Sequence, residues 1–230
     1  MASLNFIGGE KGGVGKSVMA RLLAQYFIDK EIPFIGFDTD RSHASFQRFY
    51  SDFAARTMID DYESLDHIIE AVTEQPTRQV LVDLAAQTMP PLRRWIEDSD
   101  VIALLKETET PVRFWHVMDD GVDSLGMLER LLSLFGSSVS YVIVLNHGRG
   151  SNFDRFQASS ARAQALKLGA KVIELRKLHE ASMRKIDQSN ASFWFAINSR
   201  GGADGLGLLE RQRVKIWLAK TYEDIEAVLK

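Results

Sequence analysis

Cysteine is absent from the 230 residues of the sequence. Disulfide bonds, thiolate zinc sites and cysteine-held iron–sulfur clusters are therefore excluded. Long apolar runs are missing too: nowhere do 18 apolar residues occur together, so no segment has the pattern of a membrane-spanning helix. No basic leader precedes the first apolar run, and we expect a cytoplasmic protein.

Strong charge of one sign is also lacking. The formal net charge is -3, which gives no overall case for nucleic acid binding and leaves a local basic patch as the open alternative. The five histidines show no metal-ligand spacing and no Gly-x-Ser-x-Gly motif occurs, so neither a metal site other than Mg²⁺ nor a serine hydrolase is indicated. Without repeats or linker-like segments, 45% hydrophobic residues suffice for the core of one domain over residues 1–230.

What the sequence does contain is a glycine-rich stretch over residues 8–17, GGEKGGVGKS. It follows the apolar run 4–7 and precedes the helical pattern 18–23, so a strand, a turn and a helix come in that order. Glycines let the backbone bend tightly and point N–H groups into one concavity, where the helix adds the positive end of its dipole. The residues expected to hold the phosphates of a nucleotide are Gly12, Gly13, Val14, Gly15, Lys16, Ser17 and Val18.

Two side chains of this P-loop have specific predicted roles. Lys16 can reach the terminal phosphates, and the Ser17 hydroxyl is placed to hold a magnesium ion that bridges them. The stretch departs from the usual P-loop pattern, because Glu10 stands where a glycine is expected and a second lysine, Lys11, begins the loop.

Polar side chains follow three predicted buried strands. Asp38 and Asp40 come after the strand over 32–37, and Asp83 ends the strand that begins at Val80. Ligands of open α/β sheets bind at the carboxyl ends of the strands, so these acids are expected near Mg²⁺ and water. Asn146 ends the strand over 139–146, and its amide can donate and accept, as reading a purine edge requires.

The remaining periodicities complete an α/β pattern. Apolar runs predict further strands over residues 101–105 and 171–175. Helical spacing predicts helices over residues 16–29, 42–55, 60–73, 90–96, 110–135, 156–168 and 178–186, the one over 110–135 broken at 119–121. A glycine-rich stretch over 201–205 precedes a C-terminal helix whose apolar face includes residues 214, 218, 222, 225 and 229. We predict a single domain with a mostly parallel, doubly wound sheet and helices on both faces.

The C-terminal helix carries the strongest local basic character, with Arg211, Arg213, Lys215 and Lys220 near its start. A solvated face and a non-specific contact to DNA phosphates explain this cluster equally well. The acidic residues 223, 224 and 226 argue against binding to anionic lipid, so we expect the helix to pack on the domain rather than on a membrane.

Taken in order, four motifs resemble the ParA/MinD family of ATPases with a deviant Walker A motif. They are KGGVGKS at 11–17, DTD at 38–40, DLAA at 83–86 and Asn146. The resemblance covers residues 2–150 well and the remainder only vaguely. The DLAAQ form around Asp83 is closer to members linked to plasmid mobilisation and stability than to chromosome or division-site members.

The resemblance implies a slow ATPase that uses ATP and Mg²⁺ and whose hydrolysis a partner protein stimulates. Lys11 would reach across an ATP-dependent homodimer to the nucleotide of the second subunit, and Lys16 would contact the β- and γ-phosphates. Asp40 would lie near the attacking water, Ser17, Asp38 and Asp83 would serve the metal, and Asn146 would read adenine. Such a protein acts as a switch that positions or segregates a cargo, for example plasmid DNA or a protein complex.

Two departures from the family pattern affect the switch rather than nucleotide binding. Arg41 and Ser42 follow Asp40 where the family often has Pro-Gln, and Ala85 stands where proline is frequent. A nucleotide-dependent scaffold with little hydrolysis therefore stays open. A small-molecule ligase or kinase of related fold is a further alternative, which predicts a second substrate pocket and turnover without any macromolecule. Lys11 favours the dimeric switch over this enzyme, because a small-molecule enzyme needs no lysine at a dimer seam.

Overall fold

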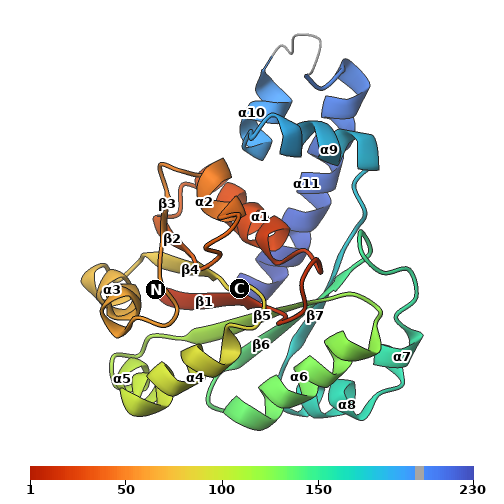
Figure 1. Cartoon of the computed structure of the whole chain (residues 1–230). Helices are drawn as coiled ribbons and strands as arrows, with labels where there is room; N and C mark the ends of the chain where they lie inside the picture. The colour runs from red at the N-terminus through yellow and green to blue at the C-terminus, as the bar shows by residue number, and fades with distance from the viewer. Residues whose placement is uncertain (200–204) are drawn as a thin grey trace.

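A computed structural model describes residues 1–199 and 205–230. Its centre is a seven-stranded sheet with parallel pairings throughout and the strand order β3-β2-β4-β1-β5-β6-β7 (Figure 1). The strands span β1 Ser3–Gly8, β2 Phe34–Asp38, β3 Ala54–Arg56, β4 Gln79–Asp83, β5 Val112–Met118, β6 Ser140–Asn146 and β7 Lys171–Leu175. The predicted α/β class is confirmed.

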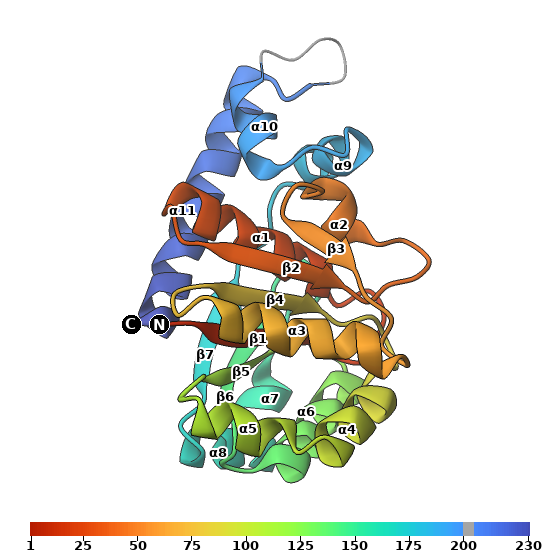
Figure 2. The ribbon, with the colours of Figure 1, turned by 90° about the vertical axis from the view of Figure 1, so that its left-hand side faces the viewer.

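Helices cover both faces of this sheet (Figure 2). One face carries α1 Lys16–Asp29, α2 Ser45–Phe49, α9 Glu180–Gln188, α10 Phe193–Asn198 and α11 Leu208–Leu229. The other face carries α3 Tyr62–Glu74, α4 Met89–Asp98, α5 Val101–Glu107, α6 Val122–Phe135, α7 Asp154–Gln157 and α8 Ser160–Lys167. The inner strands β1, β4, β5 and β6 are buried on both sides, which explains why their sequences are mainly apolar.

Two sequence predictions in the middle of the chain were wrong. Residues 101–105, predicted as a strand, form helix α5, in which Val101 and Leu105 are buried one turn apart. Residues 110–135, predicted as one broken helix, form strand β5 and then helix α6. Short apolar runs fit either structure, and the central place of β5 between β1 and β6 depends on long-range pairing that periodicity does not reveal.

Three further differences are local. The helix predicted over 42–55 is only the five-residue α2, followed by the short edge strand β3. The helix predicted over 156–168 is divided into α7 and α8, because Ser159 caps a new helix by accepting the N–H of Arg162. Helix α10 was not predicted, and the glycine-rich stretch at 201–204 lies outside the described residues. By contrast, α1 and β7 begin and end at the predicted residues.

Helix α11 packs on the domain, as predicted. Val214, Leu218 and Ile225 are buried against α1, α10 and β7. Within the described ranges, no helix has the length and apolar character needed to cross a bilayer.

Candidate functional site

The P-loop turns from β1 into α1 through glycines in left-handed backbone conformations. Gly13 and Gly15 have φ values of 80° and 102°, which residues with a side chain rarely adopt. A Cβ at Gly15 would also lie 2.3 Å from Nδ2 of Asn146. The tight approach of loop and strand end therefore depends on glycine at position 15.

Lys16 lies over this loop. Its Nζ donates to the backbone carbonyl of Lys11 at 2.9 Å, and the residue is 8% exposed. Burial lowers the pKa of Lys16, while the carboxylates of Asp83, Asp40 and Glu10 oppose that shift. The buried ammonium group of Lys16, next to the N–H groups of the glycine-rich loop, is suited to bind phosphate oxygens.

The strand ends bring the predicted acids together beside the loop. In the sheet register Asp83 on β4 lies between Ile7 of β1 and Asp38 of β2. The Asp38 carboxylate accepts the N–H of Asp40 at 2.9 Å and that of Gln47 at 3.0 Å. Asp38 thereby fixes the turn and the position of α2. Burial raises its pKa in spite of these hydrogen bonds.

Asp40 lies on the more open side of the same turn, with its side chain 34% exposed. Its Oδ1 accepts the N–H groups of Ser42 and His43 at 2.8 and 3.0 Å. Burial raises the pKa of Asp40, but these two N–H groups and the His43 ring outweigh that effect and the net shift is downward. Asp40 is therefore a carboxylate near neutral pH.

Asp83 differs from both. It is 2% exposed, and neither carboxylate oxygen has a hydrogen-bond partner among the described residues. Burial, reinforced by the Asp38 carboxylate, raises its pKa to about 8, while the Ser17 hydroxyl and the Lys16 ammonium act in the opposite direction. A buried carboxyl group without a partner is costly unless a cation or donor meets it.

These donors fit a magnesium ion. Mg²⁺ prefers oxygen ligands and commonly takes only one or two from protein, with water and nucleotide phosphates completing the octahedron. Ser17 and Asp83 supply such oxygens beside the P-loop. In the described part of the chain there is no group of three or more His, Cys, Asp or Glu that could hold a metal by itself.

Asn146 meets the P-loop from β6. Its Nδ2 donates to the carbonyl of Val14 at 2.7 Å, and its Oδ1 accepts the N–H of Gly148 at 2.9 Å. The side chain is buried and both ends of the amide contact protein. In this structure Asn146 ties β6 to the loop, and its predicted contact with adenine stays a prediction.

Sequence reasoning missed two residues that hold the site together. Thr39 accepts the N–H of Ala85 at 2.8 Å and donates its hydroxyl to the carbonyl of Asp83 at 3.0 Å, so it joins the two acidic strand ends. The Asp119 carboxylate accepts hydrogen bonds from the ammonium of Lys11 at 2.8 Å and from the hydroxyl of Ser124 at 2.6 Å. Only the DTD spacing and the Asp119-Asp120-Gly121 break were visible in the sequence, without these partners.

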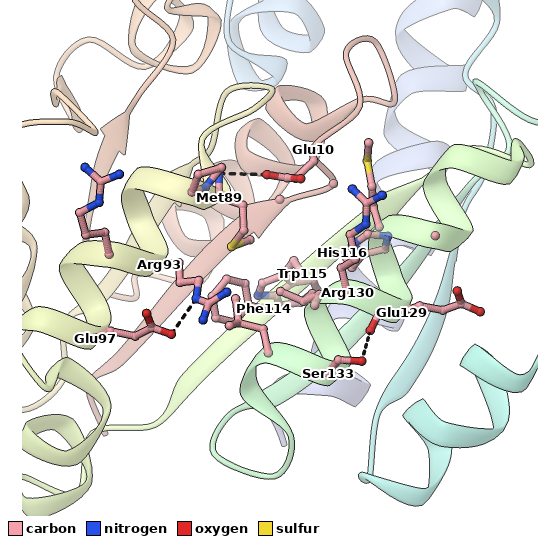
Figure 3. Close-up of a pocket in the computed structure, with 18 residues that line it drawn as sticks. Glu10, Met89, Arg93, Glu97, Phe114, Trp115, His116, Glu129, Arg130 and Ser133 are labelled. Atoms are coloured by element: carbon pink, nitrogen blue, oxygen red, sulfur yellow. Dashed lines mark hydrogen bonds and ion pairs between the residues drawn. The ribbon is translucent and has the colours of Figure 1, made fainter.

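Glu10, the irregular residue of the P-loop, also has a structural role. Its carboxylate accepts the N–H of Met89 at the start of α4, at 3.0 Å (Figure 3). A cavity of about 1000 Å³ opens beside it between α4 and α6, with Arg93 and Arg130 among its lining residues. The residues lining this cavity do not include Lys16, Ser17, Asp40 or Asp83.

Comparison with known proteins places this geometry in context. The chain is 26% and 25% identical to two Escherichia coli proteins called protein TraL, over 98–99% of both partners. No family model matches the chain.

Solved structures agree with the fold. MinD of Aquifex aeolicus matches with a TM-score of 0.56 at 13% identity, over 95% of this chain and 96% of MinD. A plasmid partition protein of Borrelia burgdorferi bound to AMPPNP matches with a TM-score of 0.52 at 13% identity, over 96% of this chain and all of that one. A nucleotide-binding protein of Archaeoglobus fulgidus in complex with ADP matches with a TM-score of 0.55 at 15% identity, over 82% and 86%.

The chain has the fold of the ParA/MinD family. The resemblance indicated by its motifs is thus confirmed at the level of the fold. Its two departures from the ParA/MinD pattern have visible consequences. Arg41 forms an ion pair with Asp60 on the surface, and the Ala85 N–H is free to donate to Thr39, which a proline at that position could not do.

Proposed function

We propose that this ParA/MinD-like chain binds ATP with Mg²⁺ at the P-loop and hydrolyses it slowly. The observation that carries the proposal is the carboxyl group of Asp83, which is buried beside Ser17 and Lys16 and has no hydrogen-bond partner among the described residues. A buried carboxyl group of this kind needs a hydrogen-bond donor or a cation, and Mg²⁺ bound with a nucleotide next to the P-loop would supply such a cation.

Each residue then has a defined task. The N–H groups of residues 12–18 and the Lys16 ammonium would bind the phosphates. Ser17 and Asp83 would hold the metal, and Asp38 lies next to Asp83 on the neighbouring strand. Bound Mg²⁺ offsets the negative charge that develops on the transferred phosphoryl group. Asp40, a carboxylate on the open side of the turn, orients the attacking water.

Lys11 makes the proposed ATPase a dimeric switch. Its side chain is 32% exposed, and its ammonium pairs with Asp119. A lysine at this rim can stabilise the phosphates of a second subunit only when two subunits meet, so ATP would favour the dimer and hydrolysis would release it. We propose that this cycle positions a cargo, with a protein partner that stimulates hydrolysis.

Nucleotide binding is tested by titrating a fluorescent ATP analogue with and without Mg²⁺. Lys16→Ala should weaken binding at least about tenfold, since a charge-assisted contact of roughly 1.5–3 kcal/mol is lost. Asp83→Asn should reduce the gain in affinity that Mg²⁺ provides. Lys167→Ala, on the exposed end of α8, is the matched control. Unchanged affinity in Lys16→Ala would disprove the assignment.

Dimer formation is tested by light scattering with a non-hydrolysable ATP analogue. Lys11→Ala should gain no mass when the ATP analogue is added, while its affinity for the nucleotide is largely kept. A Lys11→Ala protein that dimerises like the unmodified chain would contradict the cross-subunit role.

The cavity between α4 and α6 is the observation that favours a small-molecule enzyme as second candidate. Its lining includes Gly9 and Glu10 but neither Lys16 nor Asp83, which argues against direct phosphoryl transfer to a substrate bound there. Turnover of ATP that requires an added metabolite and no macromolecule would support this candidate over the switch.

A further inference from the structure

Two surface patches expose large apolar side chains. The first, called the basic patch, lies on α10 and the start of α11, where Trp194, Phe195, Leu208 and Leu209 are 56%, 53%, 76% and 68% exposed. The second, called the acidic patch, lies at the start of α3, where Met58 and Tyr62 are 50% and 38% exposed. Exposed apolar side chains that cluster in this way, in one patch near basic residues and in the other near acidic residues, are typical of interaction surfaces.

The basic patch lies on two helices that pack against each other. Helix α10 packs along α11, with the Phe193 and Trp217 rings 5.4 Å apart and the Arg211 guanidinium donating to the carbonyl of Ser199 at 2.9 Å. Glu210 is the one acidic residue in the sequence from 205 to 222, and Lys185 neutralises it at 2.8 Å. The exposed charges added by this segment are those of Arg213, Lys215 and Lys220, together with the half-buried Arg211.

The acidic patch has the opposite character. Asp60, Asp61, Glu63 and Asp66 lie within four residues of Tyr62 in the sequence, and no lysine or arginine occurs between Arg56 and Arg78. The Tyr62 hydroxyl donates to Asp98, another acid, at 2.7 Å. Arg41 forms an ion pair with Asp60, and this contact does not neutralise the charges of Asp61, Glu63 and Asp66. Glu63 and Asp66 are both exposed.

The two patches lie on different parts of the molecule. Figures 1 and 2 show α10 and the start of α11 above the sheet, beside α9, while α3 lies lower, near β4 and β3. A contact between the patches therefore joins two molecules. Because the two surfaces differ, such a contact is head-to-tail, and it continues from copy to copy unless the rotation closes a ring.

We infer that the basic patch of one molecule docks the acidic patch of a second copy of this chain. The acidic patch offers both of the properties that the basic patch requires, apolar side chains for Trp194 and Leu209 and carboxylates for Arg213. Nucleic acid backbones offer negative charge without aliphatic contacts for the two leucines. Charge complementarity of this kind steers association and fixes its orientation.

Sedimentation velocity without nucleotide, over a range of protein concentrations at low salt, tests the contact. The average mass should rise with concentration beyond that of a dimer and should fall as salt screens the charges. Arg213→Glu should weaken this self-association at least about tenfold, because like charges then face each other. Leu166→Ser and Lys167→Glu on α8, outside both patches, should leave it unchanged.

A mixing experiment tests the head-to-tail geometry. Trp194→Ser disables only the basic patch and Tyr62→Ser only the acidic patch, so each variant alone should stay monomeric. Mixed together, they retain one good pair of surfaces and should form dimers that grow no further. Circular dichroism and binding of the ATP analogue show that each variant is folded.

Three results would overturn the inference. They are a monomeric wild-type chain at every concentration and salt, a mixture that grows beyond dimers or does not associate, and an equal loss in the α8 controls. Binding of duplex DNA or phosphatidylglycerol vesicles through Arg213 without self-association would assign the basic patch to that occupant instead. Because no nucleotide is present, failure of ATP binding and failure of this contact are distinguishable.

Discussion

His116 is a titratable side chain enclosed at the centre of the sheet. It lies on β5, is 3% exposed, and its Nε2 is 3.2 Å from the carbonyl oxygen of Ser124, so the neutral ring donates Nε2–H there. Burial lowers its pKa to about 4 from 6.5. Because the folded pKa is depressed, its contribution to stability is fully present above the unfolded pKa and is lost as pH falls toward the folded one.

We predict that His116→Gln reduces the loss of stability between pH 7 and pH 4 by up to about 3 kcal/mol. Glutamine can still donate to the Ser124 carbonyl but does not titrate. The free energy of unfolding, measured with urea at a series of pH values, checks this. Asp38 and Asp83 have raised pKa values and act in the opposite direction, so the difference between the two proteins is the relevant quantity. Parallel pH profiles would refute it.

Helix α1 begins at the P-loop and contacts α2 and α9 through the buried guanidinium of Arg21. Arg21 is 3% exposed, pairs with Asp187 of α9 at 2.8 Å, and its guanidinium lies 3.6 Å from the centroid of the Phe49 ring of α2. Gln25, one turn later, accepts the Tyr50 hydroxyl and the Trp194 N–H, both at 3.0 Å. The helix that begins at Lys16 thus holds α2, α9 and α10 in place.

Replacing Arg21 by alanine should therefore destabilise the fold by about 3 kcal/mol or more, because the packing of its buried side chain on Phe49 and its ion pair with Asp187 are lost together. Asp187→Asn should cost less, roughly 1 kcal/mol or below, since Asp187 is 48% exposed and solvent screens its charge. Urea unfolding of both variants gives the comparison. Equal costs for the two substitutions would mean that the ion pair, rather than the packing of Arg21, dominates.

At the scale of the whole molecule, the proposed ligand links three neighbouring strands. Residues of the P-loop after β1, Asp38 at the end of β2 and Asp83 at the end of β4 meet at one edge of the sheet. A ligand bound there binds the folded chain and not the unfolded one. Its binding free energy therefore adds to global stability.

We predict that ATP with Mg²⁺ at a hundred times its dissociation constant stabilises the chain by about 2.7 kcal/mol, which raises the melting temperature by roughly 5–10 °C. A thermal melt followed by circular dichroism measures this. ATP with EDTA should give a smaller rise, and Lys16→Ala should give almost none. Equal shifts with Mg²⁺ and EDTA would argue against the metal site.

Local chemistry in the sequence was enough to predict the glycine-rich turn between β1 and α1. The glycines at 12, 13 and 15, the lysine and the serine lie within six residues, so strand, turn and helix could be assigned from neighbours alone, and α1 begins at the predicted Lys16. Strand β5 shows the opposite case. Residues 112–118 form the strand that pairs with β1, although their local pattern fits a helix. Strand pairing across more than a hundred residues decides their structure.

The P-loop lysines separate what the sequence determined from what the tertiary structure decided. The sequence alone determined that a glycine-rich loop with the P-loop pattern carries Lys11 and Lys16, because that motif is local. Only the folded chain decided that Lys11 is held by Asp119, 108 residues away, and that Asp83 is buried beside Ser17 with no hydrogen-bond partner among the described residues. Such contacts arise from the order in which seven strands align, and no local spacing encodes that order.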